Sequence, residues 1–388
     1  MGILGRFDTK GSSERIGGAV KLFTLLLAVT VPVSACSSPG SQAATSPSSK
    51  SIQSPPKGPQ TSATSATSAS PAGSPIAVVG SFGVLMTPIS APTYTVSLIG
   101  IDGKVVSSAQ AGSPTTVTCG GTAAAVLPLP ISTSNSRVYY LDTAGVVHFL
   151  GPTGDTGRAT TVPVGSQRRS TFSVSPNDKR IAVVVNDFTS GGAATRLYVE
   201  DLQGGTNHAD IFSETGSFGL WPIGWHGSSL VVAKVPTCTQ GGGFGCCGPL
   251  EFHLIDPATA VRSLTIGGTD CIISGPPTPG GVLCETAAVD GKVFDWNGGL
   301  RKQMPIGFQR LIYLSPDGQR LATSDSGTTT LLYETQTLKM AACGWIDDTH
   351  VFAGSDGQGQ PGVGDTTTGT VAPVAAMGTC AGRIPGGL

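Results

Sequence analysis

The residues best suited to acid–base or metal chemistry are Asp347, Asp348 and His350, which lie within four positions of one another. Carboxylates and an imidazole in one short stretch could transfer protons or hold a cation. The stretch follows a Gly344-Trp345 pair, however, and a second Gly-Trp pair is followed by Gly227-Ser-Ser at the equivalent place. Such residues are typical of a tight turn, in which side-chain oxygens bind backbone amides. The pattern therefore favours a turn between two strands.

Other candidates have equally plain structural interpretations. Trp221 and Trp225 could form a wall for ligand stacking, although such aromatic residues more often pack inside a fold. Asp201 and Asp256 each end a predicted strand, where a carboxylate typically binds turn amides. The sequence has no Gly-x-Ser-x-Gly elbow and no phosphate-binding loop, and its five histidines are scattered. We therefore predict no catalytic residue, no metal site and no cofactor.

The nine cysteines divide into one near the N-terminus and eight further along the chain. An even number of cysteines in an exported chain suggests disulfides. Proximity in sequence favours Cys271–Cys284 and Cys343–Cys380. The eight candidates are Cys119, Cys238, Cys246, Cys247, Cys271, Cys284, Cys343 and Cys380.

Cys238 has two candidate partners, Cys246 and Cys247, and either bond would clip the loop at 241–245. A covalent clip would offset part of the closure entropy of this Gly-rich loop. A metal site built from these three cysteines and His253 is the rival interpretation. It lacks the Cys-x2-Cys spacing of common zinc sites, so we favour the disulfide.

The N-terminal residues 1–35 have the pattern of a secretory signal peptide. Lys10, Arg15 and Lys21 precede an apolar run over 22–33, which is too short for a bilayer span of about 20 residues. The run ends in Val-Ser-Ala-Cys36, which resembles the bacterial lipobox. The resemblance implies that the thiol of Cys36 receives a diacylglyceryl group before cleavage. The alternatives are an ordinary signal peptide and an uncleaved anchor.

Residues 36–75 are almost wholly Ser, Thr, Ala, Pro, Gly and Gln. Such a segment buries too little apolar surface to offset its chain entropy, so we expect a disordered tether after the lipidated cysteine. This places the folded part at 76–388, on the outer side of a cell membrane and attached to it by lipid.

Two copies of one hairpin pattern organise the folded part. Residues 172–185 (Phe-Ser-Val-Ser-Pro-Asn-Asp-Lys-Arg-Ile-Ala-Val-Val-Val) and 313–323 (Tyr-Leu-Ser-Pro-Asp-Gly-Gln-Arg-Leu-Ala-Thr) each predict a strand, a turn and a strand. Their Ser-Pro pairs stand 140 positions apart. Two further internal repeats are present. Residues 80–84 recur at 216–220, an offset of 136, and residues 224–233 recur at 344–353, an offset of 120.

Each offset divided by three gives a unit of 40 to 47 residues, which is the usual length of a four-stranded propeller blade. We therefore predict an all-β fold, a β-propeller of seven blades, in which a strand near 76–79 completes the last blade and closes the ring. The predicted blades are 76–116, 117–160, 161–212, 213–268, 269–307, 308–341 and 342–388.

The two Ser-Pro hairpins resemble the blade signature of TolB-like and WD-like (WD40) bacterial propellers. That resemblance implies the fold and leaves the activity open, and we expect no separate N-terminal domain like that of TolB. With a net charge of −1, the chain has no basic field for nucleic acid. We expect a binding or scaffolding module for an envelope protein or a small ligand rather than an enzyme. The alternative is a glycan hydrolase or lyase with its site in the central channel.

Overall fold

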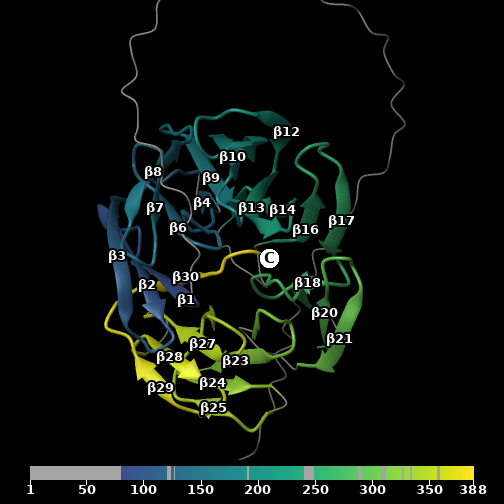
Figure 1. The fold of residues 1–388 in the computed structure, drawn as a ribbon. Helices are drawn as coiled ribbons and strands as arrows, with labels where there is room; N and C mark the ends of the chain where they lie inside the picture. The colour runs from purple at the N-terminus through teal and green to yellow at the C-terminus, as the bar shows by residue number, and fades with distance from the viewer. Residues whose placement is uncertain are drawn as a thin grey trace, which may run out of the picture. The chain divides into compact units, whose positions relative to one another are not determined.

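The computed structural model describes residues 80–388, except for 120–123, 126, 190–191, 240–248, 287–289, 307–311, 326, 333 and 356–358. The described residues form strands and no helix, so they include no apolar helix that could cross a bilayer. Seven four-stranded antiparallel sheets stand side by side around a ring (Figure 1). The predicted all-β fold and the count of seven blades are confirmed. The predicted signal peptide, Cys36 and the tether lie outside the described residues.

The strands of each blade follow one another in the chain, except in blade 1. From the innermost strand outward, blade 1 contains β30 (Thr379–Ile384), β1 (Phe82–Met86), β2 (Thr93–Gly100) and β3 (Val105–Gly112). Blade 2 contains β5 (Ile131–Thr133), β6 (Val138–Leu141), β7 (Val146–Leu150) and β8 (Thr156–Thr161). Blade 3 contains β9 (Arg168–Val174), β10 (Arg180–Thr189), β11 (Gly192–Asp201) and β12 (Ala209–Gly216). Blade 4 contains β13 (Phe218–His226), β14 (Ser229–Pro236), β16 (Glu251–Ile255) and β17 (Arg262–Gly267).

The remaining blades are shorter and follow the same order. Blade 5 contains β18 (Ile272–Ile273), β19 (Val282–Glu285), β20 (Asp290–Phe294) and β21 (Leu300–Pro305). Blade 6 contains β22 (Ile312–Leu314), β23 (Leu321–Asp325), β24 (Thr328–Leu331) and β25 (Thr337–Leu338). Blade 7 contains β26 (Gly344–Trp345), β27 (His350–Ala353), β28 (Gly362–Asp365) and β29 (Val371–Pro373). A separate two-stranded sheet joins β4 (Ala124–Ala125) to β15 (Cys238–Thr239).

The blades are held together by apolar clusters between neighbours. Seven clusters of buried side chains each join two adjacent blades around the ring. Strand β10 shows why an unbroken apolar run is needed. Ile181 and Val183 face blade 2, whereas Ala182 and Val184 face blade 4. Because successive residues of a strand point to opposite faces, a blade buried on both sides requires apolar residues at every position.

The two Ser-Pro turns use the chemistry that their sequences predict. In blade 6, the hydroxyl of Ser315 accepts a hydrogen bond from the Arg320 amide at 2.9 Å, and Gly318 has a φ of +75°. In blade 3, Asp178 occupies the corresponding left-handed position, with a φ of +59°. Its carboxylate accepts hydrogen bonds from Ser136 and Tyr139 of blade 2. These contacts with the neighbouring blade accompany the backbone strain of a non-glycine residue.

The ring closes in blade 1, where β1 pairs with β30 from Phe82↔Ile384 to Met86↔Thr379. The predicted last blade, 342–388, includes residues 379–384, and this boundary is wrong because the strand forms the inner edge of the first blade. Gly378 leads into it with a φ of +148°, and a Cβ there would lie 2.6 Å from the Met86 carbonyl oxygen. The predicted closing strand at 76–79 lies outside the described residues.

The antiparallel order gives the ring two distinct ends. At one end lie the turns between first and second strands, such as Ser175–Lys179 and Ser315–Gln319, and we call it the turn end. At the other end lie the connections between second and third strands and those between blades. All three disulfides described below lie there, and we call it the disulfide end.

Candidate functional site

Three disulfides hold the disulfide end of the described chain, and they link Cys119 to Cys238, Cys271 to Cys284 and Cys343 to Cys380. The second lies within blade 5, between its two inner strands. The third joins the inner strands of blades 7 and 1. These are the two pairs that proximity in sequence favoured.

The predicted bond from Cys238 to Cys246 or Cys247 is wrong, because Cys238 bonds to Cys119, 119 residues away. Two loops bring the pair together across blade 3. The connection from blade 1 to blade 2 meets the loop between β14 and β16. Beside the disulfide, β4 of the first segment pairs with β15 of the second. The bond also uses the thiol that a metal site with His253 would need. Cys246 and Cys247 lie outside the described residues.

We call the described parts of these two segments the crossing loops: 113–119, 124–125 and 127–130 in the first, and 237–239 with 249–250 in the second. Val117 and Cys119 pack on Phe188 and Ala193 of blade 3, and Leu127 packs against the same cluster. A covalent bond, a short sheet and an apolar contact thus fix two long loops on one end of the ring. Leu250, at the end of the second loop, remains 39% exposed. Loops placed on a rigid scaffold are where proteins most often carry their binding contacts.

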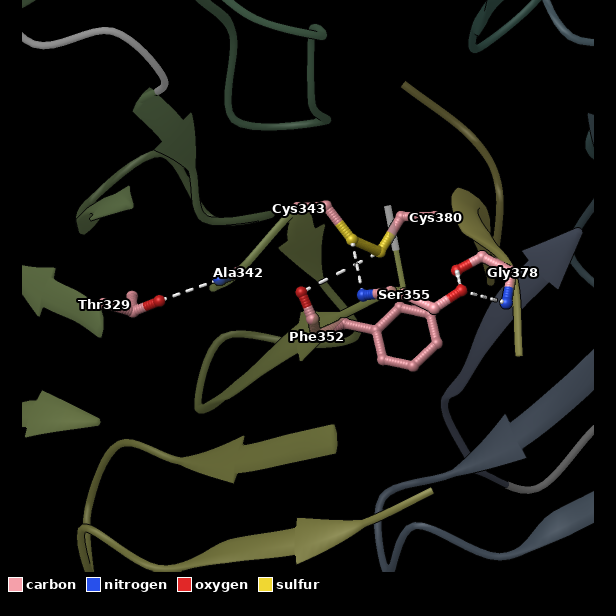
Figure 2. Close-up of a disulfide and its surroundings, with 8 residues drawn as sticks. Thr329, Ala342, Cys343, Phe352, Ser355, Gly378 and Cys380 are labelled. Atoms are coloured by element: carbon pink, nitrogen blue, oxygen red, sulfur yellow. Dashed lines mark hydrogen bonds between the residues drawn. A yellow bond between two sulfur atoms is a disulfide. The ribbon is translucent and has the colours of Figure 1, made fainter. Parts of the chain in front are cut away.

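The Cys343–Cys380 disulfide lies where the last blade meets the first (Figure 2). The Gly354 amide donates a hydrogen bond to the Cys343 sulfur at 3.1 Å. The Gly378 amide donates to the hydroxyl of Ser355 at 2.8 Å, which ties the approach to β30 to blade 7. This end of the ring is therefore closed by a covalent bond as well as by strand pairing.

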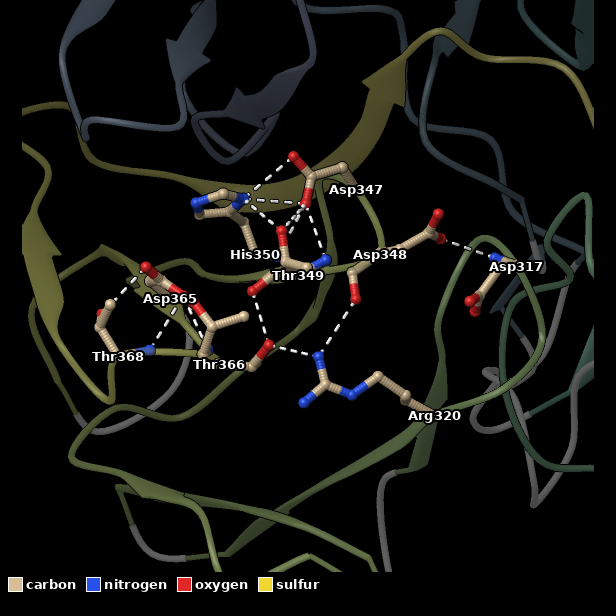
Figure 3. A network of polar contacts seen from close by, with 10 residues as sticks. Asp317, Arg320, Asp347, Asp348, Thr349, His350, Asp365, Thr366 and Thr368 are labelled. Atoms are coloured by element: carbon tan, nitrogen blue, oxygen red, sulfur yellow. Dashed lines mark hydrogen bonds and ion pairs between the residues drawn. The ribbon is translucent and has the colours of Figure 1, made fainter.

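Asp347 and His350 form the turn that the sequence predicts, between β26 and β27 (Figure 3). The Asp347 carboxylate accepts hydrogen bonds from the amides of Thr349 and His350 at 2.9 and 2.8 Å, and lies 2.8 Å from the His350 Nδ1. Burial raises the pKa of Asp347, but these hydrogen bonds outweigh it and hold the pKa below its usual value. The group is half-buried and engaged within its own turn.

Asp348 contacts the preceding blade instead. Its carboxylate accepts a hydrogen bond from the Asp317 amide at 2.8 Å, and its carbonyl accepts one from Arg320 at 3.3 Å (Figure 3). Arg320 also forms an ion pair with Glu334 in its own blade. These contacts join blades 6 and 7 at the turn end. Both carboxylates of the Asp347-Asp348 pair therefore have structural partners.

Replacement of Asp347 by Asn should lower the free energy of unfolding by about 1 kcal/mol near pH 7, because the charged acceptor is lost. A depressed pKa stabilises the fold above the unfolded value of 3.8, and this contribution disappears as the pH falls through the folded value. The difference from wild type should therefore shrink below about pH 4. Urea unfolding at several pH values measures it, with Asp270→Asn, an exposed carboxyl, as the control. A difference that is constant with pH would contradict the assignment.

The tryptophans pack as predicted rather than forming a wall. Trp225 is buried between blades 3 and 4, and Trp221 between blades 4 and 5. The Trp225 indole donates a hydrogen bond to the carbonyl of Ser173 at 3.3 Å, and the Trp345 indole donates to that of Tyr313 at 2.9 Å. The repeated Gly-Trp pair thus marks contacts with the preceding blade.

The remaining polar candidates serve local structure. Asp256 accepts a hydrogen bond from the Ala258 amide at 2.8 Å, as predicted, whereas Asp201 accepts from the side chains of Thr206 and Asn207. These bonds lower the pKa of each carboxyl. Within the described residues, no group of three His, Cys, Asp or Glu side chains is placed to hold a metal ion. Four histidines contact carboxylates nearby, in the pairs His148–Asp142, His208–Glu200, His253–Glu251 and His350–Asp347.

Residues 385–388 lie at the centre of the ring on the turn end, a feature that sequence patterns did not reveal (Figure 1). The Gly386 amide donates to the Ser134 carbonyl at 2.9 Å, and the Leu388 amide donates to that of Trp225 at 2.8 Å. The Nδ1 of His226 lies 2.7 Å from the Leu388 oxygen. This segment bridges blades 2 and 4 at the inner edge of the turn end. The disulfide end is therefore the stronger candidate for a contact surface.

Comparison with known proteins shows no family for this chain. No family model matches the sequence, and no curated protein matches it. Among solved structures, it is similar to dihydro-heme d1 dehydrogenase NirN in complex with DHE, with a TM-score of 0.41 and 14% identity over 76% of this chain and 62% of that chain. It is also similar to Sqt1 of Saccharomyces cerevisiae, with a TM-score of 0.39 and 12% identity over 76% of this chain and 87% of that chain. Likenesses at such low identity concern the fold alone.

Proposed function

We propose that this chain is an exported lipoprotein whose propeller binds a protein of the cell envelope through the crossing loops. The observation that carries the proposal is the Cys119–Cys238 bond, which fixes two loops from distant parts of the chain on one end of the ring. Rigid loops lose less conformational freedom on binding, which favours affinity.

The proposed location of the protein, outside the cytosol and attached to the membrane, is supported by two independent features. Disulfides form and persist in oxidising compartments outside the cytosol, which suits the three pairs seen here. The lipobox-like sequence at Cys36 supplies an anchor, and the tether over 37–75 would hold the ring away from the membrane.

Photo-crosslinking in intact cells tests both parts of the proposal. A crosslinking residue at Leu250, beside the crossing loops, should give a defined protein adduct. The same residue at Val261, which is 59% exposed between β16 and β17 at the turn end, is the matched control and should give none. Cys36→Ala should release the chain from the membrane fraction.

The experiments distinguish failure of the binding-end assignment from failure of the lipid anchor. Equal adducts from both positions, or an adduct from Val261 alone, would contradict the assignment of the binding end. Retention of Cys36→Ala in the membrane fraction would contradict the lipid anchor and leave the assignment of the binding end unaffected.

A further inference from the structure

A cavity of about 140 Å³ opens at the disulfide end beside blades 2 and 3. It lies where the start of the blade 1 to blade 2 connection meets the β6–β7 turn and the loop before β9. Thr115, Thr143 and Ser166 line it, together with Arg168 and Arg169. The space is large enough for several water molecules or for one small polyatomic anion.

Arg169 is the unusual residue in this cavity. Its side chain comes from β9, the innermost strand of blade 3, and the residue is only 5% exposed. Within the described residues, its guanidinium makes one hydrogen bond, from Nη1 to the Thr115 carbonyl at 3.1 Å, and no ion pair. A guanidinium carries five N–H donors, so most of those of Arg169 have no protein acceptor among the described residues. A buried charge without a partner is costly to the fold.

Two carboxylates that adjoin the lining residues in sequence or in strand register, Asp142 and Asp187, are engaged with other groups. Asp187 holds Arg168 through two hydrogen bonds, at 2.6 and 3.1 Å. Asp142 accepts hydrogen bonds from the amides of Ala144 and Val146 and lies 2.8 Å from the Nε2 of His148. Burial lowers the pKa of Arg169 to about 10, which still leaves the guanidinium charged at neutral pH. A positive charge thus remains uncompensated beside an open space.

We propose that this cavity binds one oxyanion group, a carboxylate or a phosphate, of a small soluble ligand. The Arg169 guanidinium is the main contact, because its planar fork matches two oxygens of such a group. The hydroxyls of Thr115 and Ser166 stand at the same cavity and make no hydrogen bond within the described residues, so they are free to donate. The site shares Thr115 with the crossing loops, but it uses neither Leu250 nor the Cys119–Cys238 bond, so it can be tested separately from the proposed protein partner.

Calorimetric titration of the folded chain with inorganic phosphate, and separately with acetate, tests the site. We expect saturable binding of at least one anion, and sodium chloride at matched ionic strength should give none. Arg169→Gln should weaken the binding roughly 10- to 100-fold, as expected for the loss of a charge-assisted hydrogen-bond pair. Arg169→Lys, which keeps the charge but not the fork, should fall between. Arg262→Gln, at an exposed position on β17, is the matched control and should bind as the wild type does.

The two anions separate the possible ligands, because preference for phosphate indicates a phosphorylated ligand and preference for acetate indicates a carboxylate. The proposal is overturned if wild type binds neither anion up to about 10 mM, which would mean a water-filled cavity only. It is also overturned if Arg169→Gln, shown to be folded by circular dichroism, binds as tightly as wild type.

Discussion

Deletion of residues 379–388 should leave a chain that no longer unfolds in one cooperative transition. These residues include β30, the innermost strand of blade 1, which pairs along the whole of β1. Ile384 is fully buried in the cluster between blades 1 and 2, and Cys380 contacts the cluster between blades 7 and 1. The deletion therefore removes a strand, weakens two blade interfaces and abolishes the Cys343–Cys380 bond. Urea unfolding followed by circular dichroism and by tryptophan fluorescence measures the effect.

The matched control removes only residues 385–388, which lie beyond β30. It deletes the contacts of Gly386 and Leu388 with blades 2 and 4, and should lower the free energy of unfolding by roughly 1–3 kcal/mol without loss of cooperativity. If the longer deletion unfolded as sharply and at the same urea concentration as the shorter one, closure through β30 would not be what holds the ring together.

Replacement of Cys343 and Cys380 by Ser should lower the free energy of unfolding by about 4 kcal/mol. The bond closes a chain segment of 37 residues, and the loss of its constraint on the unfolded chain is of this size. It also joins the two blades at which the ring closes, so its loss frees the inner strand β30 at its starting end. Thermal and urea unfolding of the oxidised protein test this.

The pair Cys271 and Cys284 supplies the comparison, because it closes only 13 residues and lies within a single blade. Its replacement by Ser should cost about 3 kcal/mol by the same relation and should leave the ring closure intact. Hydrogen exchange distinguishes the two cases. Only the Cys343 and Cys380 variant should lose protection along β1 and β30, and equal loss in both variants would argue against a special role in closure.

The blade architecture could be predicted because its determinants are local. The Ser-Pro turns, the Gly-Trp pairs and the unbroken apolar runs each specify a strand or a turn within about ten residues. The two members of each of the three internal repeats lie three blades apart. The Ser-Pro turns lie in blades 3 and 6 and the Gly-Trp pairs in blades 4 and 7. The Gly-Ser-Phe-Gly stretches lie at the starts of blades 1 and 4. The last repeat marks a second strand in blade 1 and a first strand in blade 4.

The features that sequence reasoning missed all depend on contacts between distant parts of the chain. Cys238 bonds to Cys119 rather than to a neighbour because two loops cross over blade 3. The strand at 379–384 joins blade 1 because an open ring would leave the edge of β1 unpaired. The cavity at Arg169 assembles from the connection between blades 1 and 2, the β6–β7 turn and the loop before β9. No local sequence pattern predicts such a site, because the sequence around a buried Arg does not distinguish it from an exposed one.

The insertion of β30 into blade 1 has a consequence for how the protein matures. A chain delivered N-terminus first presents β1, β2 and β3 long before their fourth strand is available. During that interval the inner edge of β1 is an unsatisfied row of amides and carbonyls, open to mispairing with other molecules. Folding of this chain should therefore depend on a chaperone that protects the open edge, or on rapid delivery of the last residues. A protein of the same size whose first sheet is complete by itself should depend on them less.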